Sequence, residues 1–430
     1  MSTRPYHFRP LNMGRVIVWT FFALLLLLAP MVFRSNFAVS MLAQMGIAIV
    51  ACLAYNVLLG QGGMLSFGHA VYSGLASYIA VHVLNRIADG SFPIPTSLVP
   101  FVGGLAGAAF AVLLGFVTTR KSGTPFAMIT LGIGELVFAM SLMIPEFFGG
   151  EGGVSANRAS GPAFMGLTYG PAIQVYYLLA IYTFLCTAAM FAFTRTPLGR
   201  MLNAVRDNPE RVEFIGYSTQ RVRYMAFIIS GFFAGVAGGM YALNFEIATA
   251  EVVGAARSGA YLLFTFLGGA VFFFGPIIGA VLMVLATVLL SEFTKAWLLY
   301  LGLVFLFMVM YAPGGIASLI MMNLRVAAFG RLRVLVASYV ALGGTALVML
   351  AGAGALIEMV YHLQLKDTLG ATVSYLGVPL DPRRADTWFG ACFVLLTGLG
   401  LFELARRRYR KDWGETQEWI EKEIKRREAL

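Results

Sequence analysis

Long apolar runs, separated by short polar segments, follow one another from residue 16 to residue 404. A run of about 20 apolar residues is long enough for a helix to cross the hydrocarbon core of a bilayer. The pattern therefore predicts an all-α polytopic membrane protein with about twelve apolar segments. Uninterrupted spans are expected at residues 16–33, 37–59, 97–117, 126–145, 173–193, 224–243, 297–311, 334–360 and 387–404.

Two apolar regions contain glycines at points where a regular helix would otherwise continue. One is the segment 60–84, and the other consists of the short halves 261–274 and 276–290 on either side of Gly275. Glycine lets the backbone leave helical geometry, or lets two helices approach closely. Discontinuous helices form substrate sites in transporters, so both regions are predicted to be broken or re-entrant. Ordinary helix packing through small residues is the alternative interpretation.

The longest polar interruption before residue 320 is the segment 194–223. Thr196-Pro197 is typical of a helix start, Asn208-Pro209 would end one short helix and begin another, and Gly216 is typical of a helix end. Both predicted helices have an apolar face, which a solvated linker would not need. The segment is therefore predicted to dock a cytoplasmic partner. A helical hairpin that lies on the bilayer surface is the alternative.

Charged residues make up only 12% of the chain, whereas soluble domains contain about 25%. Basic residues gather before the first span and at 120–121, 194–223, 325–333 and 406–411. Because the cytoplasmic loops of membrane proteins are rich in Lys and Arg, these clusters are predicted to be cytoplasmic. With an even number of crossings, both termini are then cytoplasmic as well. The same bias accounts for the net charge of +10 without a nucleic-acid partner.

Polar side chains also occur inside the predicted spans. Asn56 lies near the end of the span 37–59, Ser66 and His69 belong to the first glycine-rich region, and Glu135 lies near the centre of the span 126–145. Such groups are costly in a bilayer and usually line a path or face other helices. They are therefore candidates for the translocation path. For Glu135 the alternative is a neutral carboxylic acid that hydrogen-bonds to a neighbouring helix.

The sequence contains no motif that predicts catalysis. No carboxylate accompanies Ser66 and His69 to orient the histidine, so these two residues are not expected to form a nucleophile–base pair. The pattern GxxxxGK[ST] is absent, so the chain is not expected to hold ATP phosphates itself. The three cysteines lie in apolar spans and indicate neither a disulfide framework nor a metal site. We expect a transport protein rather than an enzyme.

Several ordered stretches resemble a known transporter family. The segment GQGGMLSFGHAVYSGLASYIAV is similar to the signature of permease subunits of branched-chain amino-acid ABC importers. The segment GRMLNAVRDNPERVEFIGYSTQRVRYMAFIISGFFAGVAGGMYAL resembles the cytoplasmic loop of that family and the helix after it. The stretches TLGIGELVFAM, GGEGGVSA, FLGGAVFFFGPIIGA and APGGIASLI fit the family in their order along the chain. The resemblance covers roughly residues 40–320.

The resemblance implies a permease subunit of an ATP-driven importer for branched-chain or related amino acids in a bacterial inner membrane. The implied partners are a second permease chain, cytoplasmic ATPase subunits that use the ATP, and an external solute-binding protein. This chain would bind no cofactor or metal. Residues that couple it to the ATPase are expected to be Gly199, Arg200, Ala204, Arg206, Asn208 and Gly216. The path is expected to include Asn56, Gly63, Ser66, Gly68, His69, Glu135, Gly268, Gly269 and Gly275.

The chain departs from the family pattern in two places. Val271-Phe272 stands where the family has a small pair, and the chain continues with two more spans after residue 325. We expect a permease core at 1–325, a two-span extension at 326–408 that binds a partner or stabilises the core, and a charged cytoplasmic tail at 409–430. Two other functions are compatible with the sequence. They are an ion-coupled secondary transporter with Glu135 as the coupling group, and an ABC permease for urea or another small solute.

Overall fold

The computed structural model describes residues 13–161, 166–364, 373–375 and 377–428. Most of the basic cluster predicted before the first span lies outside these residues. The described chain divides into two compact units. The first contains the residues up to 290 together with 305–317, and the second contains 291–304 and the residues from 318 onward.

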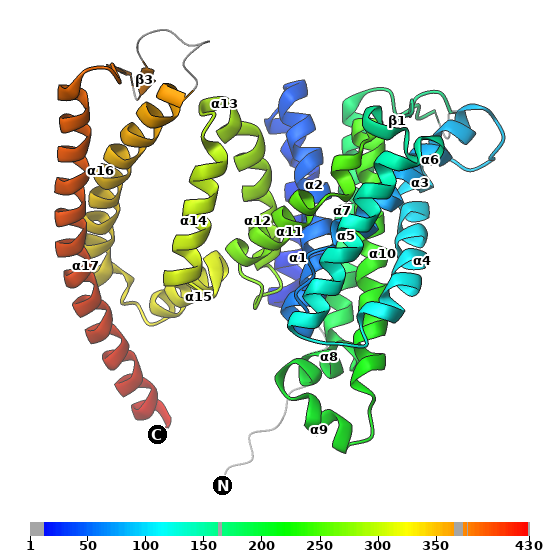
Figure 1. Cartoon of the computed structure of the whole chain (residues 1–430). Coiled ribbons are helices and arrows are strands. Elements are labelled where there is room, and N and C mark those ends of the chain that lie inside the picture. Colours follow the sequence, from blue (N-terminus) through cyan, green and yellow to red (C-terminus); the bar gives the residue numbers. More distant parts are fainter. Residues whose placement is uncertain (1–12, 162–165, 365–372, 376, 429–430) are drawn as a thin grey trace. The chain divides into compact units, whose positions relative to one another are not determined.

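The first unit is built from helices with few strands (Figure 1). Its long helices are α1 Met13–Val32, α2 Asn36–Asn56, α3 Ala70–Ala88, α4 Val99–Thr118, α5 Thr124–Met143, α7 Ala172–Arg195 and α10 Thr219–Phe245. The shorter ones are α6 Pro145–Phe148, α8 Pro197–Asp207, α9 Pro209–Phe214, α11 Ala255–Gly268 and α12 Gly275–Val284, the π-helices η1 Val57–Gln61 and η5 Leu285–Leu290, and the 3₁₀ turns η2 Thr96–Leu98, η3 Gly150–Gly152 and η4 Ala250–Val253.

Nine helices among the described residues are long and apolar enough to cross a membrane. The number rises to ten if α14 Trp297–Tyr311 and α15 Gly315–Ala328, which are bent by 49° at their junction, form one span. The helices α3 and α11 are further segments of the same bundle. The structure therefore confirms the all-α polytopic fold with about twelve apolar segments that the sequence predicts.

Helix α10 is the central helix of the first unit, because it packs along α2, α3 and α4. Glycines allow its close approach to α4. A Cβ atom added to Gly103 would lie 2.7 Å from the carbonyl oxygen of Gly235, and one added to Gly107 would lie 2.7 Å from the Cα atom of Gly235. In a membrane, where lipid tails are as apolar as leucine, such backbone contact is a main source of helix association. The α4–α10 contact thus fixes the centre of the bundle.

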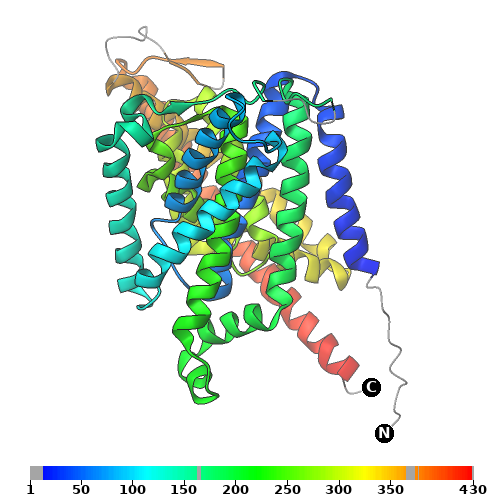
Figure 2. The ribbon, with the colours of Figure 1, turned by 90° about the vertical axis from the view of Figure 1, so that its right-hand side faces the viewer.

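One end of the first unit is closed by a short strand pair. The strand β1 Val154–Ser155, which follows the loop after α5, pairs antiparallel with β2 Ile247–Ala248 at the end of α10. Figures 1 and 2 show that α8 and α9 lie at the opposite end of this unit, and that the first turn of α1 lies at the α8–α9 end. The two ends are called the β end and the α8–α9 end below.

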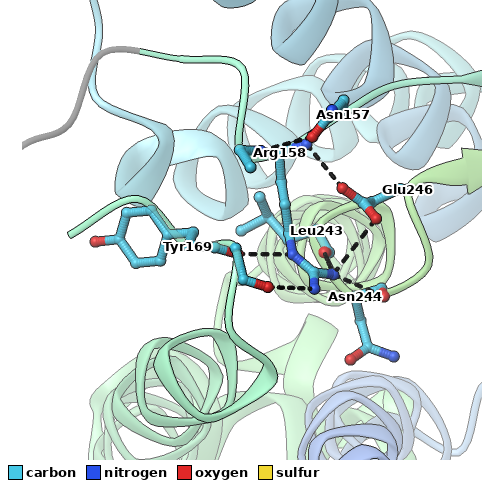
Figure 3. Close-up of polar contacts among 8 residues, drawn as sticks. Asn157, Arg158, Tyr169, Leu243, Asn244 and Glu246 are labelled. Carbon is cyan, nitrogen blue, oxygen red and sulfur yellow. Dashed lines mark hydrogen bonds and ion pairs between the residues drawn. The ribbon is translucent and has the colours of Figure 1, made fainter.

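Arg158 holds the loop at the β end onto the last turn of α10 (Figure 3). Its guanidinium donates hydrogen bonds to the carbonyl oxygens of Leu243 at 3.0 Å, Asn244 at 3.2 Å, Tyr169 at 2.8 Å and Gly170 at 3.3 Å. The backbone N–H of Arg158 donates to Glu246 Oε1 at 2.8 Å, and the side chains form an ion pair at 3.8 Å. The last carbonyls of a helix lack partners within the helix and carry partial negative charge, so a cation there is favourable.

Replacing Arg158 with alanine is expected to lower the free energy of unfolding by about 1.5–3 kcal/mol, since hydrogen bonds to charged groups contribute about that much. Thermal unfolding of the purified protein in nanodiscs would measure the change. Arg120→Ala is the control, because the Arg120 guanidinium only stacks over the Phe116 ring, at 4.5 Å, and is exposed. Unchanged stability of Arg158→Ala would show that β1 and β2 hold the loop without the arginine.

The second unit consists mainly of a helical hairpin. Helix α16 Leu332–Gln364 packs along α17 Ala385–Glu428, and the strand pair β3 Val373–Tyr375 and β4 Val378–Leu380 lies between them in the sequence. The short helix α13 Ser291–Phe293 and the start of α14 also belong to this unit. Helix α17 continues without a break from the last predicted span into the segment predicted as a charged tail. Ile420 of that segment is buried against Val326 and Leu335.

Candidate functional site

The first glycine-rich region is a broken helix in the structure. Helix α2 passes into the π-helix η1 and ends at Gly62 and Gly63, where Gly63 has a φ of +63°. Residues 64–69 are not helical, and α3 begins at Ala70. Single-turn π-helices are frequent at functional sites because they re-aim the chain within a helix. Gly63 supplies the left-handed conformation that this exit from the helix requires.

Backbone groups freed by the break find partners on other helices. The hydroxyl of Tyr55 donates to the carbonyl of Ser66 at 2.9 Å, and the N–H of Phe67 donates to Thr130 Oγ1 on α5 at 3.1 Å. The N–H of Ala70 donates to Ser258 Oγ on α11 at 3.0 Å. Non-helical backbone at membrane depth is tolerated only where protein or an aqueous cavity satisfies it. The segment is therefore held in one conformation from both sides.

Gly68 is the point of closest contact between this segment and α5. A Cβ atom on Gly68 would overlap with the carbonyl oxygen of Thr130. Three polar side chains nearby are buried, namely Asn56, Ser66 and His69, with at most 2% of their surface exposed. Asn56 Oδ1, Ser66 Oγ and both ring nitrogens of His69 have no hydrogen-bond partner within the described residues. Leaving such groups unpaired costs about 1–3 kcal/mol each.

The histidine ring is enclosed by aromatic side chains. Its centroid lies 5.1 Å from that of Tyr55, edge to face, and 6.2 Å from that of Tyr72. The structure thus brings Asn56, Ser66 and His69 into one region of the bundle. Their role in the translocation path stays a prediction.

The second glycine-rich region is also broken and lies against the first. Helix α11 ends at Gly268, Gly269 has a φ of +111°, and α12 begins at Gly275. A Cβ on Gly268 would overlap with the carbonyl oxygen of Gly275, so the two halves cross at these glycines. A Cβ on Gly60 would likewise overlap with the carbonyl oxygen of Ala270. Both breaks of the bundle therefore meet at the backbone of residues 60 and 270.

The motif APGGI lies at the same place. The φ of Gly315 is +68°, and a Cβ on it would lie 2.5 Å from the Cα atom of Gly269. Val271, which stands where the resembled family has a small residue, is 67% exposed and does not fill the crossing point. Three sequence motifs that are far apart in the chain thus converge on one backbone junction in the first unit.

The segment 194–223 forms the two predicted helices, α8 and α9. Thr196 Oγ1 accepts from the N–H of Gly199 at 3.2 Å, and Asn208 Oδ1 accepts from the N–H of Arg211 at 3.0 Å, so both residues are N-caps. Gly216 has a φ of +87° just after α9. The predicted helix boundaries are confirmed. Figures 1 and 2 show α8 and α9 projecting beyond the ends of α4 and α5 instead of lying across them.

Helix α8 contacts the first broken segment directly. Its inner face buries Gly199, Leu202 and Val205. A Cβ atom added to Gly62 would lie 3.1 Å from Leu202 Cδ1, and one added to Gly63 would lie 2.8 Å from Arg206 Cγ. The guanidinium of Arg206 donates a hydrogen bond to the carbonyl of Gly60 and pairs with Asp207 at 2.9 Å. A movement of α8 would therefore displace η1 and the junction at residues 60 and 270.

The outer side of this element is exposed. Arg200 and Ala204 of α8 are exposed. The tip around α9 exposes three large apolar side chains, Phe214 at 88%, Ile215 at 66% and Tyr217 at 53%. Exposed apolar side chains that gather beside charged ones are typical of interaction sites. The element thus combines an exposed, partly apolar outer face with an inward contact to the broken segment.

Glu135 lies in the middle of α5 and faces away from the bundle. It is exposed, as are Met128, Leu136 and Met140 on the same helix. No hydrogen bond or ion pair joins its carboxyl group to another described residue. A carboxylate at mid-span is costly against lipid. The outward face of α5 is therefore a candidate for contact with another chain or with an aqueous path.

Comparisons with known proteins find one matching family and relatives among transport permeases. The sequence pattern of the family described as "Branched-chain amino acid transport system / permease component" matches residues 37–313. The high-affinity branched-chain amino acid transport system permease protein LivM of Escherichia coli (strain K12) is 30% identical over 291 residues, which cover 63% of this chain and 67% of that protein. LivM of Salmonella typhimurium matches to the same extent. The fructose import permease protein FrcC of Rhizobium meliloti is 26% identical over 246 residues, 52% of this chain and 64% of that protein. No solved structure matches the chain.

Proposed function

Because the chain belongs to the family of branched-chain amino acid transport system permease components, we propose that it forms the membrane path of an ATP-driven importer for branched-chain or related amino acids. The permease family and the spans of the first unit make it a multi-pass membrane transport subunit. The proposal adds the solute, the direction and the coupling to ATP. The observation that carries the coupling is the contact of α8 with η1, through Leu202 and Arg206.

The proposed coupling is mechanical. ATPase subunits bind the exposed face of α8 and the apolar tip at Phe214, Ile215 and Tyr217. Two capped helices joined at Asn208-Pro209 are stiff enough to transmit a push, whereas an uncapped loop would absorb it. The push reaches Gly60, which contacts the second broken segment at Ala270. Both glycine-rich regions then move together when ATP is bound or hydrolysed.

The remaining partners are proposed from features of the first unit. The outward face of α5, with Glu135, is proposed to face a second permease chain and the path between the two chains. The β end is proposed to receive the external solute-binding protein. The α8–α9 end, with its arginines, is then cytoplasmic, and the first turn of α1 lies at that end (Figure 2). We propose a bacterial inner membrane, and the basic residues at 406–411 support a cytoplasmic C-terminus as well.

Reconstitution tests the proposal. The chain is co-expressed with its second permease, ATPase and binding-protein subunits, and the complex is placed in proteoliposomes. We expect ATP-dependent accumulation of radiolabelled leucine, isoleucine or valine, and none with an ATPase whose phosphate-binding lysine is replaced. Accumulation driven by a proton or sodium gradient without ATP would contradict the coupling and support a secondary transporter.

A different small solute is the second candidate. The similarity to a fructose import permease, which extends over 52% of this chain, favours it. The same proteoliposomes are therefore tested with fructose, urea and a nucleoside. ATP-dependent uptake of one of these and not of amino acids would leave the coupling intact and replace the solute.

A further inference from the structure

Arg257 is a cation inside the first unit, and no acidic side chain among the described residues forms an ion pair with it. It lies in the first turns of α11, near the β end, and its guanidinium carbon is 5.1 Å from the ring centroid of Tyr241 and 5.8 Å from that of Tyr261. None of the ion pairs formed by the described residues involves Arg257. The aromatic rings stabilise the cation but leave its charge uncompensated. An arginine within a bundle usually marks a functional position.

A cavity of about 60 Å³ adjoins the guanidinium. Residues from α2, α10, α11, α12 and η5 line it, and the polar ones among them are Gln44, Tyr241, Arg257, Tyr261 and Thr287. A water molecule needs about 10–15 Å³. The cavity therefore has room for about four to six groups of the size of water, which is close to the size of the carboxylate and amino groups of an amino acid together. Its other walls, which include Ile47, Met283 and Val284, are apolar.

A second cavity, of about 10 Å³, also borders Arg257, Tyr241 and Tyr261. It is lined by Ser77 of α3, whose side chain is 1% exposed and whose hydroxyl has no hydrogen-bond partner among the described residues. Buried hydroxyl groups are usually paired, so this one indicates a place prepared for a polar group. Arg257 thus stands between two small spaces that both offer hydrogen-bond donors.

We propose that the cavity beside Arg257 binds the carboxylate group of the transported solute as it enters from the β end. The forked donors of a guanidinium fit the two oxygens of a carboxylate, and this pairing is stronger than that of a neutral amide with the same oxygens. The apolar walls then face the aliphatic part of the solute. This inference rests on the proposed function, because it takes an amino acid as the solute.

Transport by the whole complex in proteoliposomes provides the first test. At saturating binding protein, Arg257→Gln is expected to lower the rate of leucine uptake roughly 10- to 100-fold, the range expected for losing a charge-assisted hydrogen bond. Arg257→Lys keeps the charge without the fork and is expected to retain more uptake than Arg257→Gln. Arg120→Gln, which removes an arginine that also lies over an aromatic ring, is the control and is expected to keep wild-type uptake. Wild-type uptake by Arg257→Gln would overturn the proposal.

Direct binding separates a ligand site from a structural role. The unfolding temperature of the complex without binding protein is measured with isovalerate, with isovaleramide or with chloride, at equal ionic strength. Isovaleramide has nearly the same shape as isovalerate but no charge. We expect isovalerate alone to raise the unfolding temperature, and Arg257→Gln to abolish the rise while its own unfolding temperature stays within the assay window. An equal rise with chloride, or a rise that persists in Arg257→Gln, would overturn the carboxylate site.

The same measurements distinguish this inference from the proposed function. If the wild-type complex imports only fructose or urea, the amino-acid function fails, and the isovalerate assay still decides whether the cavity binds a carboxylate. If the complex imports leucine and the Arg257 variants behave as the wild type, the function stands and the cavity is rejected.

Discussion

Replacing Gly68 with leucine is expected to stop uptake while the protein remains in the membrane. A side chain at this position would overlap with the Thr130 carbonyl, so residues 64–69 would have to leave the surface of α5. The hydrogen bonds from Phe67 to Thr130 and from Ala70 to Ser258 would then break. Overpacking of this kind costs about 1–3 kcal/mol, which distorts the segment without unfolding the whole bundle.

The measurement is ATP-dependent leucine uptake, normalised to the amount of protein in the membrane. Gly344→Leu is the matched control, because a Cβ there would meet no atom within 4 Å in the second unit. Gly68→Ala gives a graded test, since the smaller side chain creates the same overlap with less bulk. Wild-type uptake by Gly68→Leu at a normal membrane level would exclude the segment 64–69 from the path.

Local signals in the sequence were sufficient to predict the short elements. Thr196, Asn208 and Gly216 each determine a helix boundary through their own backbone and side-chain chemistry, and the structure places the boundaries there. The break at Gly63 is likewise local, because a positive φ is favourable only for glycine. The second break is predicted at residues 274–276, whereas α11 already ends at Gly268 and the positive φ falls at Gly269. The lengths of the apolar runs were likewise sufficient to predict the all-α polytopic fold.

Contacts between distant residues could not be predicted in this way. Arg206 lies 146 residues from Gly60 in the sequence, and neither segment contains a feature that indicates a contact with the other. The outward position of Glu135 depends on which face of α5 packs inward, and α5 is apolar on all sides, so periodicity gives no answer. Buried Ile420 looks like part of a solvated charged helix until α15 and α16 are placed beside it.

Arg158 and Arg257 were missed for a different reason. Each is a single arginine in or next to a polar loop, where arginine is common and needs no partner. What distinguishes them is the surroundings: carbonyl oxygens at the end of α10 for Arg158, and two tyrosines beside a cavity for Arg257. To predict either role from the sequence, one would have to know that residues 241–246 lie next to both arginines.

Docking and transmission by α8 and α9 are expected to be separable by mutation. Phe214, which is 88% exposed, is part of the apolar tip. Phe214→Asp places a charge there and is expected to remove the ATPase subunits from pull-downs. Arg206→Met keeps an apolar stem against Gly63 but cannot donate to the Gly60 carbonyl. We therefore expect Arg206→Met to keep the ATPase bound and to keep hydrolysing ATP.

The quantity that changes in Arg206→Met is the amount of solute moved per ATP hydrolysed. A hydrogen bond from a charged group contributes about 1.5–3 kcal/mol, so its loss from a two-state coupling element is expected to lower that ratio about tenfold or more. Arg200→Met is the control within the same helix, because Arg200 is exposed and, among the described residues, it is Arg206 that donates to the Gly60 carbonyl of η1. It is expected to weaken ATPase binding without changing the ratio in the complexes that remain. An unchanged ratio in Arg206→Met would show that the push from α8 reaches the path by another contact, such as Leu202 against Gly62.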